Sequence, residues 1–262
     1  MIIMDKRATY ICGTFRRIAL LEEAISCFLA QEYDGPKHLV VVNDEPEQTL
    51  EFDHPEVTIV NLKQRISLEA KRNIAAAERI TETDVFFHMD DDDLFASERT
   101  EKCIEMMANG EIFKTDDWML DTSPPSRVVG RTIANYAFTP NLLMRYGGYR
   151  RHHGRPYDDI NIINHFDYYM EYHGLKVAPI DMPFFYCRKN IPGEPHLSYS
   201  RNNNLPVMTA PPARTGVIKL EPSLDFDWSF RYKLPSERVP IHELDSAYSP
   251  VDLTRFYKGI GE

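Results

Sequence analysis

The chain is poor in cysteine and has no long apolar run. Its four cysteines form no CxxC pair, so the sequence predicts neither a zinc site nor a disulfide framework. No apolar stretch reaches the roughly 18 residues that a membrane helix needs, and residues 1–10 lack the apolar segment of a secretory signal. We therefore expect a soluble, cytoplasmic protein whose cysteines are small core residues in a reducing compartment.

Basic residues are in the minority, with 30 Lys and Arg against 40 Asp and Glu and a formal net charge of −10. This charge opposes non-specific attraction to nucleic acids or anionic lipids unless basic residues are concentrated locally. The 12 glycines and 18 prolines form no repeat, and aromatic residues make up 11% of the 262 residues. The composition is that of a globular protein and excludes disordered, fibrous and mini-protein classes.

Short β-rich segments alternate with amphipathic helical segments in the first half of the chain. We expect strands over residues 9–12, 38–42, 57–62 and 85–89, with helices over 18–29 and 67–80. This alternation predicts an α/β fold with a mostly parallel sheet covered by helices on both faces. Ligands of such sheets bind at the carboxyl ends of the strands.

The second half carries weaker patterns. We expect a helix over 97–107 with Ser97 as its N-cap, short strands over 112–114 and 132–138, and a helix over 160–173 closed by Gly174. After residue 204, prolines interrupt every possible long element. The sequence therefore predicts one domain over 1–204 and a proline-rich extension over 205–262 that packs on the domain or on a partner.

Four adjacent aspartates at residues 90–93 directly follow an apolar strand. Adjacent carboxylates repel one another, and a divalent cation relieves this repulsion. Mg²⁺ and Mn²⁺ prefer oxygen ligands and bridge one or two carboxylates to substrate phosphates. The segment predicts a metal-dependent phosphate chemistry, and a solvated acidic turn is the alternative.

Two such chemistries are disfavoured by the neighbouring residues. A haloacid-dehalogenase-type phosphatase has its nucleophilic Asp followed by Asp-x-Thr or Asp-x-Val, and the segment ending at Leu94 lacks that residue. A sugar-phosphate nucleotidyltransferase has a Gly-rich, Lys-containing loop after its first strand. The Gly-Thr-Phe-Arg-Arg segment at residues 13–17 is not such a loop.

Five short motifs follow one another in the first half of the chain. They are Gly-Thr-Phe-Arg at 13–16, a helix at 21–31, Val-Val-Asn-Asp at 41–44, Lys-Arg-Asn-Ile-Ala at 71–75 and Met-Asp-Asp-Asp-Asp at 89–93. In this order they resemble five motifs of the inverting family-2-type glycosyltransferases of GT-A fold. These motifs are the Thr-Tyr-Asn-Arg-like loop, the first helix, the Val-Val-Asp-Asp strand end, the Ala-Arg-Asn-x-Gly helix and the Leu-Asp-x-Asp-Asp (DXD) motif. The resemblance implies transfer of a hexose from a nucleoside diphosphate sugar, UDP-linked in our prediction, to an acceptor hydroxyl.

The resemblance also implies which residues bind the donor. Thr14 and Phe15 would border the base and ribose, Asp44 would hydrogen-bond the ribose or base, and Arg72 would contact the base or diphosphate. The implied donor site also includes Arg17, Asp90 and Asp91, and the implied ligands of Mn²⁺ or Mg²⁺ are Asp92, Asp90 and His196. Phe15 and Asn43 stand where the family usually has Tyr and Asp, which leaves the base preference open, and pairing of Arg72 with a nearby acid is an alternative.

An inverting transfer needs a carboxylate that takes the proton of the acceptor hydroxyl. The family places it after a Gly-Gly-aromatic turn, which Gly-Gly-Tyr at 147–149 resembles. Asp159 is our first choice, Asp158 the second, and Asp167 a rival. A role as a helix N-cap alone is the alternative for Asp158 and Asp159.

A basic segment surrounds the Gly-Gly-Tyr turn and contains Arg145, Arg150, Arg151 and Arg155 among aromatic residues. Arginines interleaved with aromatics suit phosphates and stacked bases, so the segment favours an anionic acceptor, and a solvated basic loop is the alternative. The candidate acceptors are a glycan, a lipid-linked sugar, a protein and a hydroxymethylated DNA base, which would have to leave the stack. Two other functions stay open: a catalytically silent sugar-nucleotide or glycan-binding module, and a metal-dependent phosphatase or nucleotidyltransferase.

Overall fold

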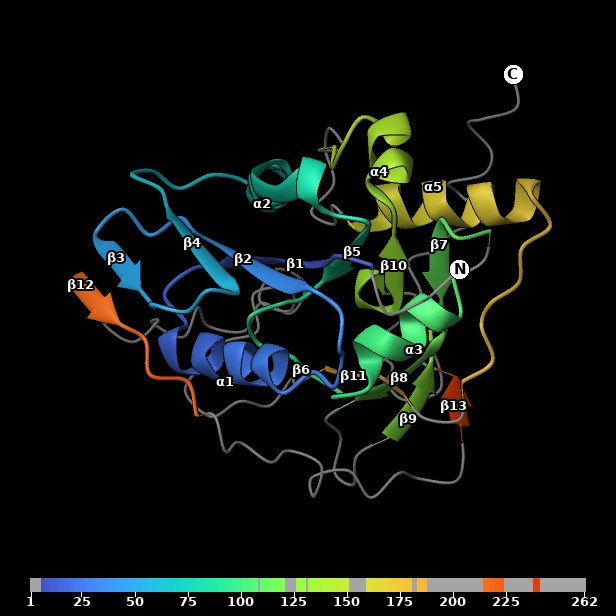
Figure 1. The fold of residues 1–262 in the computed structure, drawn as a ribbon, viewed down its shortest axis with the longest axis horizontal. Helices are drawn as coiled ribbons and strands as arrows, with labels where there is room; N and C mark the ends of the chain where they lie inside the picture. Colours follow the sequence, from blue (N-terminus) through green and yellow to red (C-terminus); the bar gives the residue numbers. More distant parts are fainter. Residues whose placement is uncertain are drawn as a thin grey trace, which may run out of the picture.

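A six-stranded sheet forms the centre of the computed structural model (Figure 1). The structure describes residues 6–107, 109–120, 126–130, 132–150, 159–180, 183–187, 214–223 and 238–240. The strand order is β4 (Val57–Asn61), β2 (Lys37–Asn43), β1 (Ala8–Thr14), β5 (Val85–His88), β10 (Tyr136–Phe138) and β7 (Ile112–Lys114). The first four are parallel, and β10 runs antiparallel to both of its neighbours. The predicted α/β fold with a mostly parallel sheet is confirmed.

Helices cover both faces of this sheet because its strands alternate apolar side chains between two cores. One core contains Tyr10 of β1 together with residues of α1 (Ile18–Leu29) and α3 (Arg99–Glu105). The opposite core contains Ile11 together with residues of α2 (Leu68–Arg79), α4 (Pro140–Tyr146) and α5 (Asp159–Tyr172). In Figure 1, α1 lies below the sheet and α2, α4 and α5 lie above it. None of the helices in the described ranges is long and apolar enough to cross a membrane.

Local signals explain where the helices next to the site begin and end. Ser67 caps α2, since its hydroxyl accepts the backbone N–H of Ala70. Thr139 caps α4 in the same way, and Gly147 ends α4 in a left-handed conformation with φ of 82°. The predicted cap of α3 is wrong, because α3 begins at Arg99 after Glu98, and the Ser97 hydroxyl instead bonds carboxylates of neighbouring glutamates.

A second sheet follows the acidic segment and was not predicted. Its order is β13 (Arg238–Pro240), β9 (Ser126–Val129), β8 (Asp117–Leu120), β11 (Phe185–Cys187) and β6 (Leu94–Phe95). A separate parallel pair joins β12 (Gly216–Lys219) to β3 (Gln48–Glu51). The expected strand at 132–138 is shorter, because a 3-10 helix, Ile133–Asn135, precedes β10. A second 3-10 helix, Ile80–Glu82, follows α2.

The described parts of the predicted C-terminal extension pair with the rest of the fold. β12 pairs with β3 along its whole length, and the side-chain amide of Gln48 donates to the carbonyl of Arg214. β13 pairs with β9 at the edge of the second sheet. The boundary at residue 204 stays a prediction.

Candidate functional site

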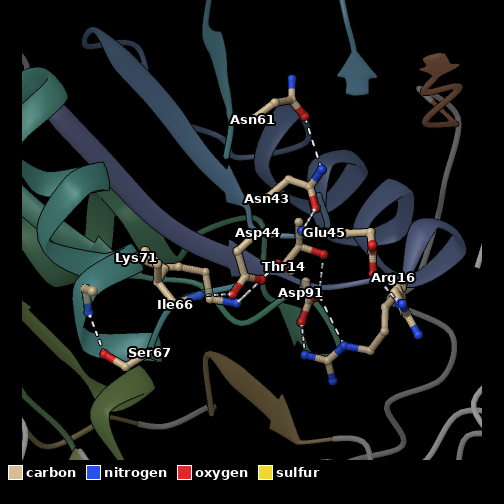
Figure 2. A network of polar contacts seen from close by, with 12 residues as sticks. Thr14, Arg16, Asn43, Asp44, Glu45, Asn61, Ile66, Ser67, Lys71 and Asp91 are labelled. Carbon is tan, nitrogen blue, oxygen red and sulfur yellow. Dashed lines mark hydrogen bonds and ion pairs between the residues drawn. The ribbon is translucent and has the colours of Figure 1, made fainter. Parts of the chain in front are cut away.

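The polar motifs meet at the carboxyl ends of three neighbouring parallel strands, β1, β2 and β5. In the β1–β2 register, Thr14 pairs with Asn43, so the residues that follow both strands emerge side by side. β5 lies on the other side of β1, and the backbone N–H of Met89 donates to the carbonyl of Ile11. The Thr14 hydroxyl then donates to Asp91 Oδ2 over 2.6 Å (Figure 2). The predicted donor-site residues from these strands are thus brought together.

The aspartates after β5 are paired with basic side chains and largely buried. Asp91 is 0% exposed and Asp92 is 6% exposed, whereas the Asp90 side chain is 31% exposed. The Arg17 guanidinium forms ion pairs with both Asp91 and Asp92. Arg72 Nη2 lies 3.2 Å from Asp90 Oδ1. The alternative of a solvated acidic turn is therefore wrong. Arg72 pairs with an acid, as its alternative predicted, and its contact with the donor stays a prediction.

Burial and mutual repulsion set the charge state of this cluster. Burial raises the pKa of Asp91 to about 6, with Arg17 acting against the shift and the neighbouring Asp92 adding to it. Burial also acts to lower the pKa of Arg17, but Asp91, Asp92 and Asp90 together raise it above its ordinary value. Arg17 is therefore a permanent cation held against the buried carboxylates.

The Asp44 carboxylate has its hydrogen-bond partners within the protein, and one of them is Lys71, which was not among the predicted site residues. Asp44 is 0% exposed, and its Oδ2 accepts the backbone N–H of Ile66 over 3.1 Å. Its Oδ1 lies 3.0 Å from Lys71 Nζ, which also donates to the carbonyl of Thr14 over 3.2 Å (Figure 2). Lys71 therefore joins the ends of β1 and β2. The signal was its place in the Lys-Arg-Asn motif, at the position where the resembled family has Ala.

The third residue of that motif docks the Gly-Gly-Tyr turn onto α2. Asn73 Nδ2 donates to the carbonyl of Tyr149, and Asn73 Oδ1 accepts the Tyr149 N–H, both over 2.8 Å. Gly148 has φ of 79°, and a Cβ there would lie 2.7 Å from Asn73 Oδ1, so glycine permits this approach. The Tyr149 hydroxyl also lies 3.0 Å from Nε2 of His88, whose pKa is held well below its ordinary value by burial. The turn is thus fixed beside the end of β5.

The base-binding residue implied by the resemblance is covered by an arginine that was not predicted. Phe15 is partly buried, and the guanidinium carbon of Arg65 lies 3.3 Å from the centre of its ring. Arg16 has a left-handed backbone with φ of 66° and pairs with Glu45. The next residue, Arg17, points toward Asp91 and Asp92 instead. The Arg65 guanidinium therefore covers the face of the Phe15 ring.

The predicted acceptor residues lie only partly within the described chain. Asp159 begins α5, as expected, but its side chain lies outside the described residues, as do Asp158, Arg151, Arg155 and His196. Asp167 pairs with Lys114 over 2.9 Å and accepts the hydroxyl of Tyr136 over 2.5 Å. These contacts bind α5 to the ends of β7 and β10.

The two described arginines of the basic segment have local partners. Arg145 lies 3.3 Å from Glu111, and both side chains are solvent-accessible. The guanidinium of Arg150 lies 5.5 Å from the centre of the Tyr146 ring, within the range of a cation–π contact. Exposed ion pairs such as Arg145–Glu111 contribute little to stability.

The cluster suits a metal ion that takes most of its ligands from substrate and water. No group of three or more His, Cys, Asp or Glu residues placed to hold a metal ion occurs within the described ranges. Mg²⁺ and Mn²⁺ in phosphate sites use only one or two carboxylates, which Asp90 and Asp92 can supply. The guanidinium on Asp91 and Asp92 shows that a cation fits against these oxygens.

Comparisons with known proteins agree with this architecture. The sequence model of Glycosyl transferase family 2 matches residues 10–138. Among solved structures, the chain is similar to the mannosyltransferase PcManGT from Pyrobaculum calidifontis in complex with GDP-Man and Mn²⁺, with 18% identity, a TM-score of 0.50, and coverage of 72% of this chain and 58% of that chain. It is also similar to S. aureus TarS 1-349 in complex with UDP, with 14% identity, a TM-score of 0.48, and coverage of 70% and 60%.

The chain therefore covers about 60% of the length of these two structures. No curated protein sequence matches it. The family match includes β1, β2, β5 and the acidic segment, which are the parts that build the site. The predicted resemblance and fold are confirmed: residues 10–138 match glycosyl transferase family 2, and the chain has the GT-A fold.

Proposed function

We propose that the protein transfers a hexose from a nucleoside diphosphate sugar to an acceptor hydroxyl, with inversion and with Mn²⁺ or Mg²⁺. The observation that carries the proposal is the single polar network that joins Thr14, Asp44, Lys71 and Asp91 at the carboxyl edge of a family-2 domain. We propose UDP as the nucleotide, as the motif resemblance implies. The GDP-Man complex of the mannosyltransferase makes GDP the second donor to test.

The donor diphosphate would lie over the aspartates that follow β5. Asp90 and Asp92 would hold the metal ion, which when bound offsets the negative charge that grows on the leaving diphosphate. Arg72 adds a buried positive charge beside Asp90. Phe15 and Arg65 offer a stacking surface for the base at the end of β1.

The acceptor side would supply the base. The acceptor oxygen attacks the anomeric carbon from the face opposite the diphosphate, its proton passes to a carboxylate, and the diphosphate leaves with the bonding electron pair. We propose Asp159 for this role, with Asp158 second, because α5 begins at Asp159 after the docked Gly-Gly-Tyr turn. Asp167 is the weaker rival, because Lys114 and Tyr136 already engage its carboxylate.

We propose an acceptor that carries negative charge. Arg145, Arg150, Arg151 and Arg155 follow one another around the Gly-Gly-Tyr turn in a chain of net charge −10. Hydroxymethylated DNA and glycans or lipid-linked sugars that bear phosphate both present such charge. Neutralising Arg150 and Arg151 should raise the acceptor Michaelis constant in a salt-sensitive way, and an unchanged constant would favour a neutral acceptor.

The test is an assay of nucleoside diphosphate release and sugar transfer with UDP- and GDP-hexoses and Mn²⁺. Release of UDP or GDP only when sugar appears on an acceptor, with inverted configuration, is expected. Asp159→Asn should keep donor binding and lose turnover. If Asp167→Asn on the same helix does this instead, the assignment of Asp159 as the base is wrong. Binding without turnover on any acceptor would favour a catalytically silent module, and free phosphate or pyrophosphate would favour a phosphatase or nucleotidyltransferase.

A further inference from the structure

Arg17 occupies the position of a cation inside the acidic cluster. Its Nη1 and Nη2 atoms form ion pairs with Asp92 and Asp91, and its Nε lies 3.2 Å from Asp91 Oδ2. The Arg17 side chain is only 14% exposed, and the two carboxylates are 8% exposed or less. All three guanidinium nitrogens are therefore directed at these two acids, out of bulk solvent.

A divalent ion and this guanidinium would compete for the same oxygens. Two adjacent buried carboxylates repel each other, and one positive charge beside them removes much of that repulsion. An ion that arrives at Asp92 meets an oxygen already paired with Arg17, and two like charges on one carboxylate repel at short range. The metal ion alone therefore has to displace an ion pair before it binds.

The attachment of Arg17 permits such a displacement. Arg17 precedes the first turn of α1 and forms no capping bond with its side chain. The residue before it, Arg16, holds a left-handed backbone that is unfavourable for a residue with a Cβ. Asp91 keeps a second partner, the Thr14 hydroxyl, when the guanidinium leaves.

We propose that Arg17 is an exchangeable internal counter-ion: its guanidinium pairs with Asp91 and Asp92 before metal and donor bind, and moves to the donor diphosphate when both bind together. This inference rests on the proposed function. A planar guanidinium binds carboxylate and phosphate oxygens with the same two-pronged geometry, so the exchange preserves its hydrogen bonds. Metal and nucleotide then bind cooperatively, and metal alone binds weakly.

The experiment compares Arg17→Gln with Arg16→Gln. The second variant also removes one positive charge, but from the adjacent residue, which pairs with Glu45 and not with the aspartates. Mn²⁺ binding to the full chain is followed by electron paramagnetic resonance, with and without UDP or GDP. Arg17→Gln should bind Mn²⁺ alone about tenfold more tightly than the natural chain, because charged hydrogen bonds of this strength no longer compete. It should bind the nucleotide about tenfold more weakly in the presence of Mn²⁺, and Arg16→Gln should change the affinity for Mn²⁺ alone less than about twofold.

Unchanged or weaker binding of Mn²⁺ alone in folded Arg17→Gln would overturn the exchange. Arg17→Lys keeps the charge but loses the planar geometry, so a Mn²⁺ affinity above that of the natural chain is expected there too, and this variant carries the test if Arg17→Gln does not fold. Failure of the natural chain to bind any nucleoside diphosphate with Mn²⁺ would overturn the proposed function. The arm with Mn²⁺ alone separates the two failures.

Discussion

Replacement of Asn73 by alanine tests whether α2 positions the acceptor half of the site. Asn73 makes two hydrogen bonds of 2.8 Å to the backbone of Tyr149, and they link residues 76 positions apart. The predicted base, Asp159, follows this turn in the chain. Asn73→Ala should therefore loosen the turn, reduce turnover and leave donor binding intact.

The size of the effect on stability follows from the two bonds. Each contributes about 1 kcal/mol net, which gives about 2 kcal/mol for the pair. Alanine has a higher helix propensity than asparagine, which offsets about 0.5 kcal/mol of this loss of stability at this helical position. The free energy of unfolding should fall by about 1.5 kcal/mol, and turnover should fall by about 10- to 100-fold if the reacting groups are displaced by about 1 Å.

Asn61 provides a matched control. Its amide makes the same pair of bonds to the backbone of Leu50 in strand β3, at 2.8 and 3.0 Å, and its Oδ1 also accepts the side-chain amide of Asn43 over 3.1 Å. Urea unfolding and transfer kinetics should be measured for Asn73→Ala and Asn61→Ala together. Both variants should lose stability, and only Asn73→Ala should lose turnover by at least tenfold at unchanged nucleotide affinity. A stable Asn73→Ala, or an equal loss of turnover in both variants, would refute the reasoning.

Two further predictions concern buried groups. Lys71→Met should lower the free energy of unfolding by about 3–5 kcal/mol in urea, because it leaves the Asp44 carboxylate buried without its cation. The double variant with Asp44→Asn should recover part of this loss, and no recovery would contradict the pairing. Burial and, second, Arg79 lower the pKa of His38 from 6.5 to about 4. Because the unfolded chain then binds a proton that the folded chain does not, the free energy of unfolding should fall by up to about 3 kcal/mol as pH falls from about 6.5 to about 4. His38→Gln should flatten this part of the pH profile, and an identical profile in both proteins would argue against the assignment.

The fold was predictable where local pattern and burial agree. The apolar runs of β1, β2, β4 and β5 and the periodicity of α1 and α2 identified the parallel part of the central sheet. The second sheet was missed because its strands are short. β6 has two residues, and β11 pairs with β6 and β8 from distant parts of the chain. Such pairing is decided by tertiary contacts that leave no local period.

The site was predictable in its members but not in its pairings. The motifs indicated Thr14, Asp44, Arg72 and the aspartates as neighbours, because the carboxyl ends of parallel strands meet at one edge. The ion pairs of Arg17 connect residues 74 and 75 positions apart, and no spacing in the sequence encodes them. Lys71 was overlooked for the same reason, because only the structure shows that it reaches the ends of both β1 and β2.

The central claim is that the aspartates after β5 bind a nucleoside diphosphate through a divalent ion. Its most direct test is calorimetric titration of UDP and GDP into the natural chain and into Asp92→Ala, each with and without Mn²⁺. The exposed Asp53→Ala is the control for loss of one negative charge. The account predicts Mn²⁺-dependent nucleotide binding in the natural chain and in Asp53→Ala, and none in Asp92→Ala. Equal binding in all three proteins, or binding that does not depend on Mn²⁺, would contradict it.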